Sequence, residues 1–222
     1  KCFVLEAKND PQKQFILSQY LIEGQELFER DLETGLTYLN ECIKSGLVEA
    51  AIYYCRILIK GNLIHRDIEK AKKLLERNIK EKDPEIYYLL HAKIKKKEGM
   101  LDESLELFEK SMSFGNIEAI YEYGKLLQYV YADVDDDKSS KGYYYIQKAI
   151  CDNYPKALLK CGLVLIRSEN QKDNLIGAKC IQIAADAGNK DALYNYGRLL
   201  NQGNIITRDE EKAFEYMKKA AY

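Results

Sequence analysis

No charge of either sign dominates this sequence. It holds 34 lysines and arginines against 35 aspartates and glutamates, so its formal net charge is −1 at pH 7. A protein that its overall field draws to nucleic acid or to an anionic membrane needs a clear excess of positive charge. We therefore expect no nucleic acid and no membrane surface among its partners.

Long apolar segments are also missing. The run GLVLI at residues 162–166 is far shorter than the roughly 20 residues needed to span a bilayer. The opening KCFVLEAKND lacks the apolar stretch and the small-residue cleavage site of a secretory signal. We expect no membrane insertion. A first residue of Lys instead of Met indicates either a fragment or a processed piece of a longer protein.

Residues that carry catalysis or bind metals are scarce. The two histidines, His65 and His91, are accompanied by no nucleophile motif such as G-x-S-x-G. The acidic run DVDDD at 133–137 does not make a calcium loop, because Lys138 stands where the turn glycine belongs and Tyr144 where the bidentate glutamate belongs. We therefore predict no enzyme, no metal site and no cofactor.

The cysteines form no recognisable framework. None of them makes a C-x-x-C pair, the usual spacing of a structural zinc site, and the chain has no N-x-[ST] glycosylation sequon. The six are Cys2, Cys42, Cys55, Cys151, Cys161 and Cys180. This pattern favours free, mostly buried thiols in a reducing compartment, and so a cytoplasmic protein.

The sequence repeats itself. The segments at residues 61–71 and 203–213 read GNLIHRDIEKA and GNIITRDEEKA, and they agree at eight of eleven positions. A repeat must leave markers at a fixed period between its most similar copies. Alanines recur with a small residue five positions later and a leucine eight positions later: Ala50, Ala119, Ala157 and Ala192; Cys55, Gly124, Gly162 and Gly197; Leu58, Leu127, Leu165 and Leu200.

A second series of small residues marks the other half of each repeat. It consists of Gly35, Ala71, Ser104, Gly142, Ala178 and Ala213, each followed seven positions later by another, mostly small residue: Cys42, Asn78, Ser111, Ala149, Ala185 and Ala220. Between these markers the apolar residues follow helical spacing. We predict an all-α chain of six antiparallel helix-turn-helix repeats of about 36 residues, with approximate bounds of 12–46, 47–82, 83–114, 115–154, 155–188 and 189–222.

Glycines and aspartates indicate where the helices end and begin. Gly61 and Gly203 follow the first helix of their repeats, where a left-handed residue is needed, and Asp67 and Asp209 are positioned to cap the second helix. Glycine inside a helix costs roughly 1 kcal/mol relative to alanine. We attribute the mid-helix glycines of the first series to close packing against the partner helix, and expect the four leucines to be buried.

The end of the chain resembles a known repeat family. Residues 192–203 and 210–221 read ALYNYGRLLNQG and EEKAFEYMKKAA. They resemble the Sel-1-like repeat, a relative of the tetratricopeptide repeat, whose pattern reads A-x-x-x-x-G-x-x-[LY]-x-x-G, then K-A, then an A-A pair. The resemblance covers residues 156–222, 47–77 and 115–150, and weakens over 12–46 and 85–114, where His91 stands near the small-residue position. It implies an α/α superhelix, or solenoid, and a role as a non-catalytic adaptor or scaffold for other proteins.

The resemblance also implies a binding surface. In the tetratricopeptide arrangement, five positions of each first helix line a concave face. Carried onto this chain, these positions name Arg56, Lys60, Glu118, Tyr121, Lys125, Gln128, Tyr129, Asp191, Tyr194, Arg198, Asn201 and Gln202. Cations recur at one of them, in Arg56, Lys125 and Arg198, and Leu163 interrupts this basic line. We expect an acidic or C-terminal segment of a partner protein to bind along it.

Two alternatives stay open. The cations are also explained as solvated charges that the neighbouring acids Glu49, Glu118 and Asp191 neutralise. The chain as a whole is alternatively a regulatory repeat segment of a larger multidomain enzyme such as a protein kinase, since it stops at KKAAY without the turn that follows the same helix in IAADAGN.

Overall fold

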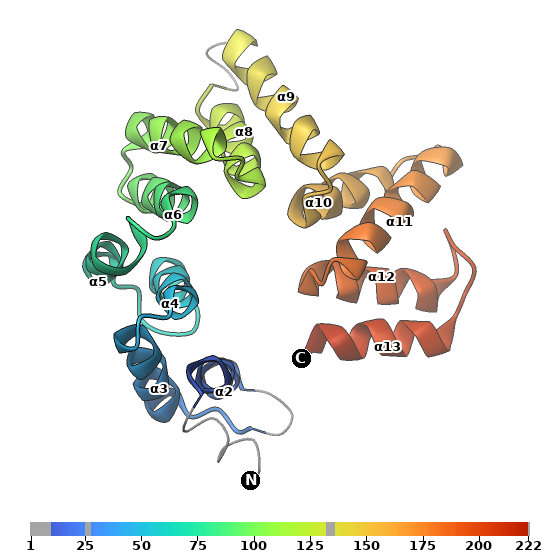
Figure 1. Cartoon of the computed structure of the whole chain (residues 1–222). Helices are drawn as coiled ribbons and strands as arrows, with labels where there is room; N and C mark the ends of the chain where they lie inside the picture. Colours follow the sequence, from blue (N-terminus) through green and yellow to red (C-terminus); the bar gives the residue numbers. More distant parts are fainter. Residues whose placement is uncertain (1–9, 25–27, 132–135, 222) are drawn as a thin grey trace. The chain divides into compact units, whose positions relative to one another are not determined.

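The computed structural model describes residues 10–24, 28–131 and 136–221. Within these ranges the chain forms twelve α-helices, one π-helical segment and no β-strand (Figure 1). The predicted all-α class is confirmed. Cys2 and most of the acidic run at 133–137 lie outside the described residues, so the expectations made for them stay predictions.

The chain divides into two compact units, residues 1–119 and 120–222. The helices of the first unit are α2 (Pro11–Glu23), α3 (Leu32–Lys44), α4 (Val48–Lys60), α5 (Ile68–Leu74), the π-helical segment η1 (Leu75–Ile79), α6 (Pro84–Lys97) and α7 (Leu101–Ser113). Helix α8 (Ile117–Tyr131) crosses the boundary. The second unit continues with α9 (Asp136–Cys151), α10 (Pro155–Leu165), α11 (Gln171–Asp186), α12 (Lys190–Gln202) and α13 (Glu210–Ala221).

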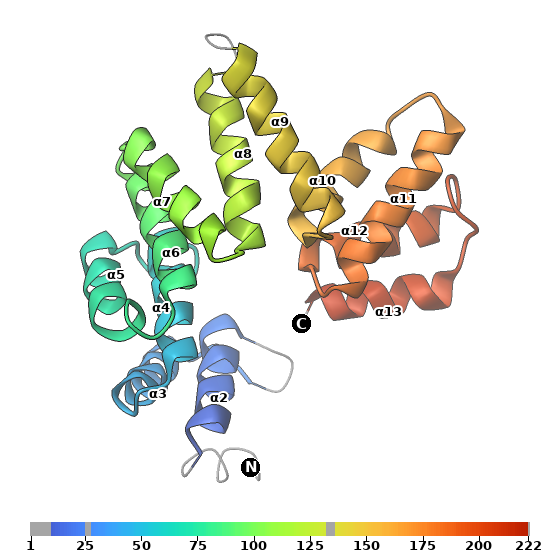
Figure 2. The same ribbon diagram turned by 45° about the horizontal axis from the view of Figure 1, so that its top comes forward.

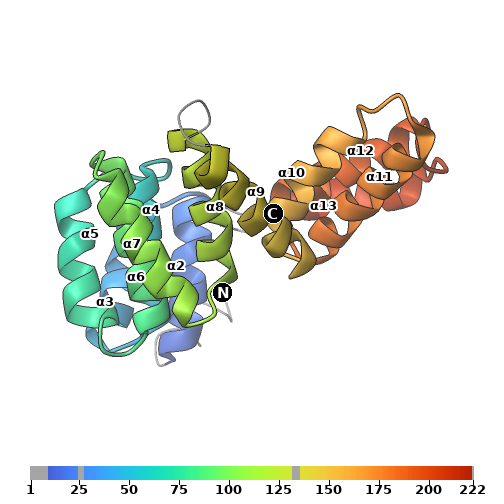
Figure 3. The same cartoon turned by 90° about the horizontal axis from the view of Figure 1, so that it is seen from above.

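Consecutive helices form side-by-side pairs, as the repeat pattern predicts. In the first unit α2 packs on α3, α4 on α5 and α6 on α7 (Figure 2). In the second unit α10 packs on α11 and α12 on α13, and α11 also packs on α12 (Figure 3). Each unit buries its own apolar core, which includes Leu39 and Leu58 in the first and Leu158 and Ile181 in the second.

The repeated segment forms the same turn in both of its copies. Gly61 and Gly203 end α4 and α12 in the left-handed conformation, with φ of 70° and 68°. The N–H groups of Asp67 and Asp209 then donate to last-turn carbonyls of these helices at 3.3 and 3.1 Å. Each aspartate Oδ1 also accepts the N–H three residues further on, at 2.9 and 3.0 Å, and so caps the next helix. The predicted roles of the glycines and aspartates are confirmed.

Glycines in mid-helix allow the two helices of a repeat to touch. A Cβ atom placed on Gly162 of α10 would lie 2.7 Å from the carbonyl oxygen of Gly177 in α11. A Cβ atom on Gly124 of α8 would lie 2.7 Å from the carbonyl oxygen of Gly142 in α9. Gly197 makes the corresponding contact with α13. The close packing predicted for these glycines is confirmed.

Gly162→Ala is expected to lower the free energy of unfolding by about 1 to 2 kcal/mol, although alanine is the better helix former. The new methyl group would meet the Gly177 carbonyl oxygen and Ile181 Cγ1 at 2.7 and 2.6 Å. A backbone oxygen cannot move to another rotamer as a side-chain atom can, so α10 and α11 must move apart. Urea denaturation followed by circular dichroism measures the change. Lys160→Ala, at an exposed position of the same helix, is the control, and equal stability of Gly162→Ala and the wild type would contradict the contact.

Three of the four leucines in the repeat pattern are buried as predicted. Leu58, Leu127 and Leu200 are 2%, 3% and 6% exposed. The prediction is wrong for Leu165, which is only half-buried. Leu165 lines an open pocket together with Val164, so α10 is less fully covered than the spacing alone predicts.

The second repeat holds one residue more in its second helix than the marker spacing assumes. Leu75–Ile79 form a π-helical turn, in which the Lys80 N–H donates to the Leu75 carbonyl at 3.0 Å. The extra residue moves the core position by one. Ile79 is fully buried, whereas Asn78, the position that the spacing predicts, is half-buried.

In the third repeat the small residue that faces the partner helix is Ala92, and His91 stands next to this position, as the sequence pattern indicates. Ala92 is fully buried in α6, and its carbonyl accepts a hydrogen bond from Ser104 Oγ of α7 at 2.8 Å. Ser104 is the small residue predicted for the second helix. A hydroxyl contact therefore takes the place that two glycines occupy in other repeats.

Candidate functional site

The residues predicted to line the binding surface lie on three first helices. Helix α4 carries Arg56 and Lys60, α8 carries Glu118, Tyr121, Lys125, Gln128 and Tyr129, and α12 carries Asp191, Tyr194, Arg198, Asn201 and Gln202. Arg56, Lys60 and Glu118 belong to the first unit and the others to the second.

In the first unit Glu118 contacts two cations. Its Oε2 lies 3.1 Å from Arg56 Nη2 of α4, and its Oε1 lies 2.5 Å from Lys93 Nζ of α6. The Glu118 side chain is 14% exposed, against 31% for Arg56 and 21% for Lys93. These ion pairs connect the start of α8 with α4 and α6. Lys60, at the end of α4, is exposed.

The charge of Glu118 is stabilised by these contacts. Burial alone would raise the pKa of the carboxyl group, because it disfavours a charge. The attraction of Lys93 and Arg56, with their hydrogen bonds, outweighs burial and lowers the pKa from 4.5 to about 2. Glu118 therefore neutralises part of the positive charge of Arg56, as the alternative interpretation of the basic line expects.

Lys93 is a cation of this series that the sequence pattern misses. It follows Ala92 directly, as Arg56 follows a small residue in α4. The sequence pattern is weak in this repeat and gives no exact small-residue position, so it does not identify Lys93. The pair of small residues Ala92 and Ser104 fixes the register of this repeat and so identifies Lys93. The structure shows a hydrogen bond between the two.

The α8 residues of the second unit differ widely in exposure. Tyr121 is 4% exposed and packs against Tyr154, with ring centroids 5.3 Å apart, so the structure places it in the core. Lys125 Nζ lies 5.1 Å from the centroid of the Tyr121 ring and 3.6 Å from Glu122 Oε1. Tyr129, in contrast, is 81% exposed.

All five predicted residues of α12 are exposed. They recur at helical spacing and share one face of the helix, while the opposite face is buried. Tyr194 is 55% exposed. Arg198 Nη2 donates to Asn195 Oδ1 at 3.4 Å, and within the described part of the chain Arg198 forms no ion pair with a carboxylate.

Two open pockets lie on the second unit near these helices. One, of about 600 Å³, lies between α12 and α13 and is lined by Tyr194 and Met217, among others. The other, of about 400 Å³, is lined mainly by apolar side chains of α8, α9 and α10 and includes Gln128. Tyr143 and Val164 of this second pocket are 61% and 66% exposed.

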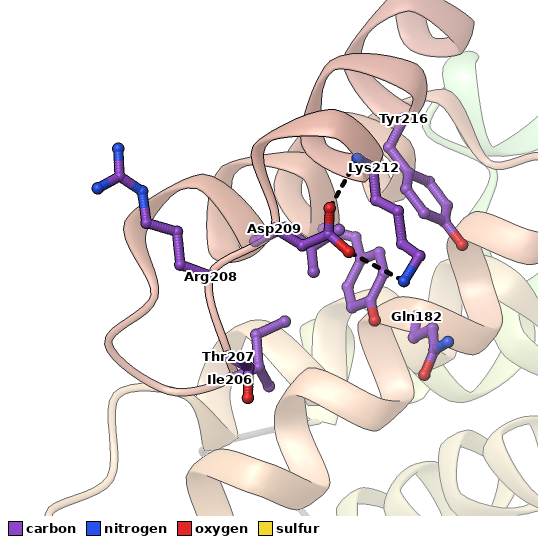
Figure 4. Close-up of a pocket in the computed structure, with 9 residues that line it drawn as sticks. Gln182, Ile206, Thr207, Arg208, Asp209, Lys212 and Tyr216 are labelled. Carbon is purple, nitrogen blue, oxygen red and sulfur yellow. Dashed lines mark hydrogen bonds and ion pairs between the residues drawn. The ribbon is translucent and has the colours of Figure 1, made fainter.

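A third pocket, of about 500 Å³, is bordered by the loop that joins α12 to α13 (Figure 4). Asp209 and Lys212 are paired at its edge, with Lys212 Nζ 2.9 Å from Asp209 Oδ2, and hydrogen bonds from Lys212 lower the pKa of Asp209. Arg208 points away from this pair in Figure 4. The Tyr216 hydroxyl donates to Asp186 Oδ1 at 2.7 Å. These polar groups serve the helix cap and the contact between helices.

The two histidines have different surroundings. His65 is exposed in the loop before α5. His91 is half-buried beside the Tyr87 ring, and burial lowers its pKa. Among the described residues, no three potential metal ligands come together. No helix in the described ranges combines the length and the apolar character that crossing a membrane requires.

The five described cysteines are free thiols. Cys42 and Cys55 are buried, and burial raises the pKa of Cys42 to about 11 and that of Cys55 to about 12. Cys161 and Cys180 are half-buried, and Cys151 is exposed. The prediction of mostly buried thiols is therefore wrong for Cys151.

Comparison with known proteins supports the repeat assignment. The family model of the Sel1 repeat matches residues 48–77 and 190–222. These segments include all of α4, α5, α12 and α13, together with both copies of the repeated turn. No curated protein sequence matches the chain.

Two solved structures from Pseudomonas aeruginosa share the fold at low sequence identity. The Pseudomonas aeruginosa protein PA5086 is 16% identical with a TM-score of 0.65, and the immunity protein Pa5087 of the same organism is 19% identical with a TM-score of 0.64; both comparisons cover 95% of this chain and 80% of the other. A Sel1 repeat protein from Oxalobacter formigenes is 22% identical with a TM-score of 0.44 over 98% of this chain, which spans 64% of that protein's length. The described residues thus form an all-helical repeat fold, in which the segments 48–77 and 190–222 match the Sel1 repeat.

Proposed function

We propose that this chain is a non-catalytic scaffold that binds a partner protein or peptide through the exposed face of its first helices. Repeats of the Sel1 and tetratricopeptide type generally serve protein interaction, which supports the class of function. The exposed face of α12 is the observation that carries the proposal. It presents an arginine without a carboxylate partner in the described chain beside a large exposed aromatic ring.

The chemistry of this face indicates what it binds. The guanidinium of Arg198 offers a planar set of donors that matches a carboxylate. Tyr194 offers apolar area with little conformational entropy to lose, and the pocket beside it, lined by Met217, has room for an apolar side chain. The partner segment is therefore acidic, with an apolar residue close to its carboxylate.

The remaining predicted residues have secondary roles in this proposal. Lys125, Gln128 and Tyr129 of α8 extend the surface within the second unit. In the first unit, Arg56 and Glu118 hold helices together, so we place the centre of the site on α12. Neither the Sel1 match nor the similar structures favour the alternative of a regulatory segment of a kinase.

The double change Tyr194→Ala, Arg198→Ala is expected to remove at least nine tenths of partner binding without changing the fold, since both side chains are exposed. Partners captured on the immobilised wild-type chain are identified by mass spectrometry. The strongest of them is then titrated against wild type and variant. Circular dichroism confirms that the variant has the helical content of the wild type.

Lys172→Ala is the matched control, because it removes an exposed cation from α11 in the same unit. It should bind the partner as the wild type does. Binding by the wild type should weaken as salt rises, because an exposed ion pair with Arg198 is screened. Undiminished binding by the double variant would contradict the proposal for α12 and direct the search to the other faces of the repeats.

A further inference from the structure

Helices α10 and α11 are in contact through their backbones. A Cβ atom on Gly162 would lie 2.7 Å from the Gly177 carbonyl oxygen, and one on Gly177 would lie 2.9 Å from the Gly162 carbonyl oxygen. Cys161 directly precedes Gly162 on α10, and Cys180 follows Gly177 by one helical turn on α11. The two helix backbones therefore touch beside the cysteines, with no side chain between them.

The two cysteines flank this contact on the two helices. Ile181, the residue after Cys180, has its backbone nitrogen 3.2 Å from a Cβ atom placed on Gly162, the residue after Cys161. Burial, followed by the neighbouring Cys161, raises the pKa of Cys180. Both residues are half-buried. Cys161 also lines the open pocket of about 400 Å³ on α8, α9 and α10, which gives small molecules access to it from solvent.

The other described thiols have different partners. Cys42 Sγ donates to the Pro11 carbonyl at 3.4 Å, and Cys55 Sγ donates to the Ala71 carbonyl at 3.6 Å. Cys151 is exposed. Among the described cysteines, Cys161 and Cys180 are therefore the two that flank a backbone contact between neighbouring helices.

We propose that Cys161 and Cys180 form a redox-active pair, which a peroxide converts into a disulfide that joins α10 to α11. A disulfide requires Cα atoms about 4.4 to 6.8 Å apart. Most pairs of packed helices do not meet this requirement in mid-helix, because side chains fill the space between them. The glycine contact beside the two cysteines removes this obstacle.

The oxidation balances with the peroxide as the electron acceptor. The Cys161 thiolate attacks one peroxide oxygen, the O–O bond breaks, and a sulfenic acid and one water form. The Cys180 sulfur then attacks the sulfenic sulfur, the S–O bond breaks, and a second water leaves as the S–S bond forms. The two thiols together lose two electrons and two protons, and the peroxide is reduced to two waters.

Trypsin offers a direct test, because both cysteines begin a tryptic peptide. Cleavage after Lys160 and Lys179 releases residues 161–167 and 180–190, and Cys151 falls in a separate peptide, 149–156. The folded chain is treated with hydrogen peroxide, free thiols are blocked, and the chain is digested without reductant. We expect mass spectrometry to find 161–167 joined to 180–190, and dithiothreitol to release both.

Single variants test whether the disulfide forms specifically between Cys161 and Cys180 and not between any two oxidised cysteines. Cys161→Ser and Cys180→Ser should each lose the linked peptide, while Cys151→Ser should retain it at wild-type yield. Circular dichroism of the four proteins before treatment verifies that they are folded alike. Recovery of 161–167 and 180–190 as separate peptides from the treated wild type, or linkage of either to 149–156 in their place, would overturn the proposal.

Discussion

Glu118→Gln is expected to lower the free energy of unfolding by about 2 to 3 kcal/mol at neutral pH. The lowering of the Glu118 pKa from 4.5 to about 2 corresponds to about 3 kcal/mol in favour of the folded, ionised form. The partial exposure of Arg56 and Lys93 reduces this value. The variant removes the negative charge that both cations contact. Urea denaturation at pH 7 measures the difference.

The dependence on pH gives a second readout of the same contact. A carboxylate with a lowered pKa stabilises the folded chain fully above its unfolded pKa, and this contribution is lost as the pH falls through the folded pKa. Between pH 4.5 and about 2 the wild type should therefore lose stability that Glu118→Gln lacks from the start. Glu69→Gln is the control, because Glu69 is a 74% exposed partner of Lys72. Identical acid unfolding of wild type and Glu118→Gln would contradict the role of Glu118.

Leu58→Ala is expected to lower the free energy of unfolding by about 2 to 5 kcal/mol. Leu58 is 2% exposed within the core of the first unit, so the shorter side chain leaves a cavity that the surrounding helices fill only in part. The same substitution at Leu165 removes a half-buried side chain and should have a clearly smaller effect. Denaturation curves of the two variants and the wild type test this order.

Leu58 and Leu165 occupy the same position of their repeats, which makes them a matched pair. If position in the repeat decided stability, the two substitutions would be equivalent. If burial decides it, as the structure indicates, Leu58→Ala is the more damaging by a wide margin. A larger effect at Leu165 would show that the pocket beside α10 is closed in solution.

The turns are the part of the fold that the sequence predicts best. A glycine at a left-handed position and an aspartate at a helix start act through local backbone geometry. Residues 61–67 and 203–209 therefore specify the same turn in two different surroundings. The contact between mid-helix glycines is predictable for a related reason, since a residue without a side chain has little other purpose inside a helix.

The exposure of the candidate site is harder to predict, because it depends on what packs against a helix. Tyr121 and Tyr194 hold the same position of their repeats, yet they are 4% and 55% exposed. The Tyr154 ring, from the segment after α9, covers Tyr121. The local sequence does not predict the contacts of Glu118 either, because Arg56 lies 62 residues away along the chain. Such contacts follow from the assembled helices and not from any one of them.

The π-helical turn at Leu75–Ile79 restores the phase of its helix. One residue inserted into an α-helix rotates everything after it by about 100° about the axis, which would carry the apolar stripe toward solvent. Widening a single turn absorbs the rotation, so that Ile79 still faces the core. The array therefore has a way to accept a change in repeat length inside a helix. An alignment of its repeats needs a one-residue gap within 75–79, and a gap placed in the following loop would assign the intervening side chains to the wrong face.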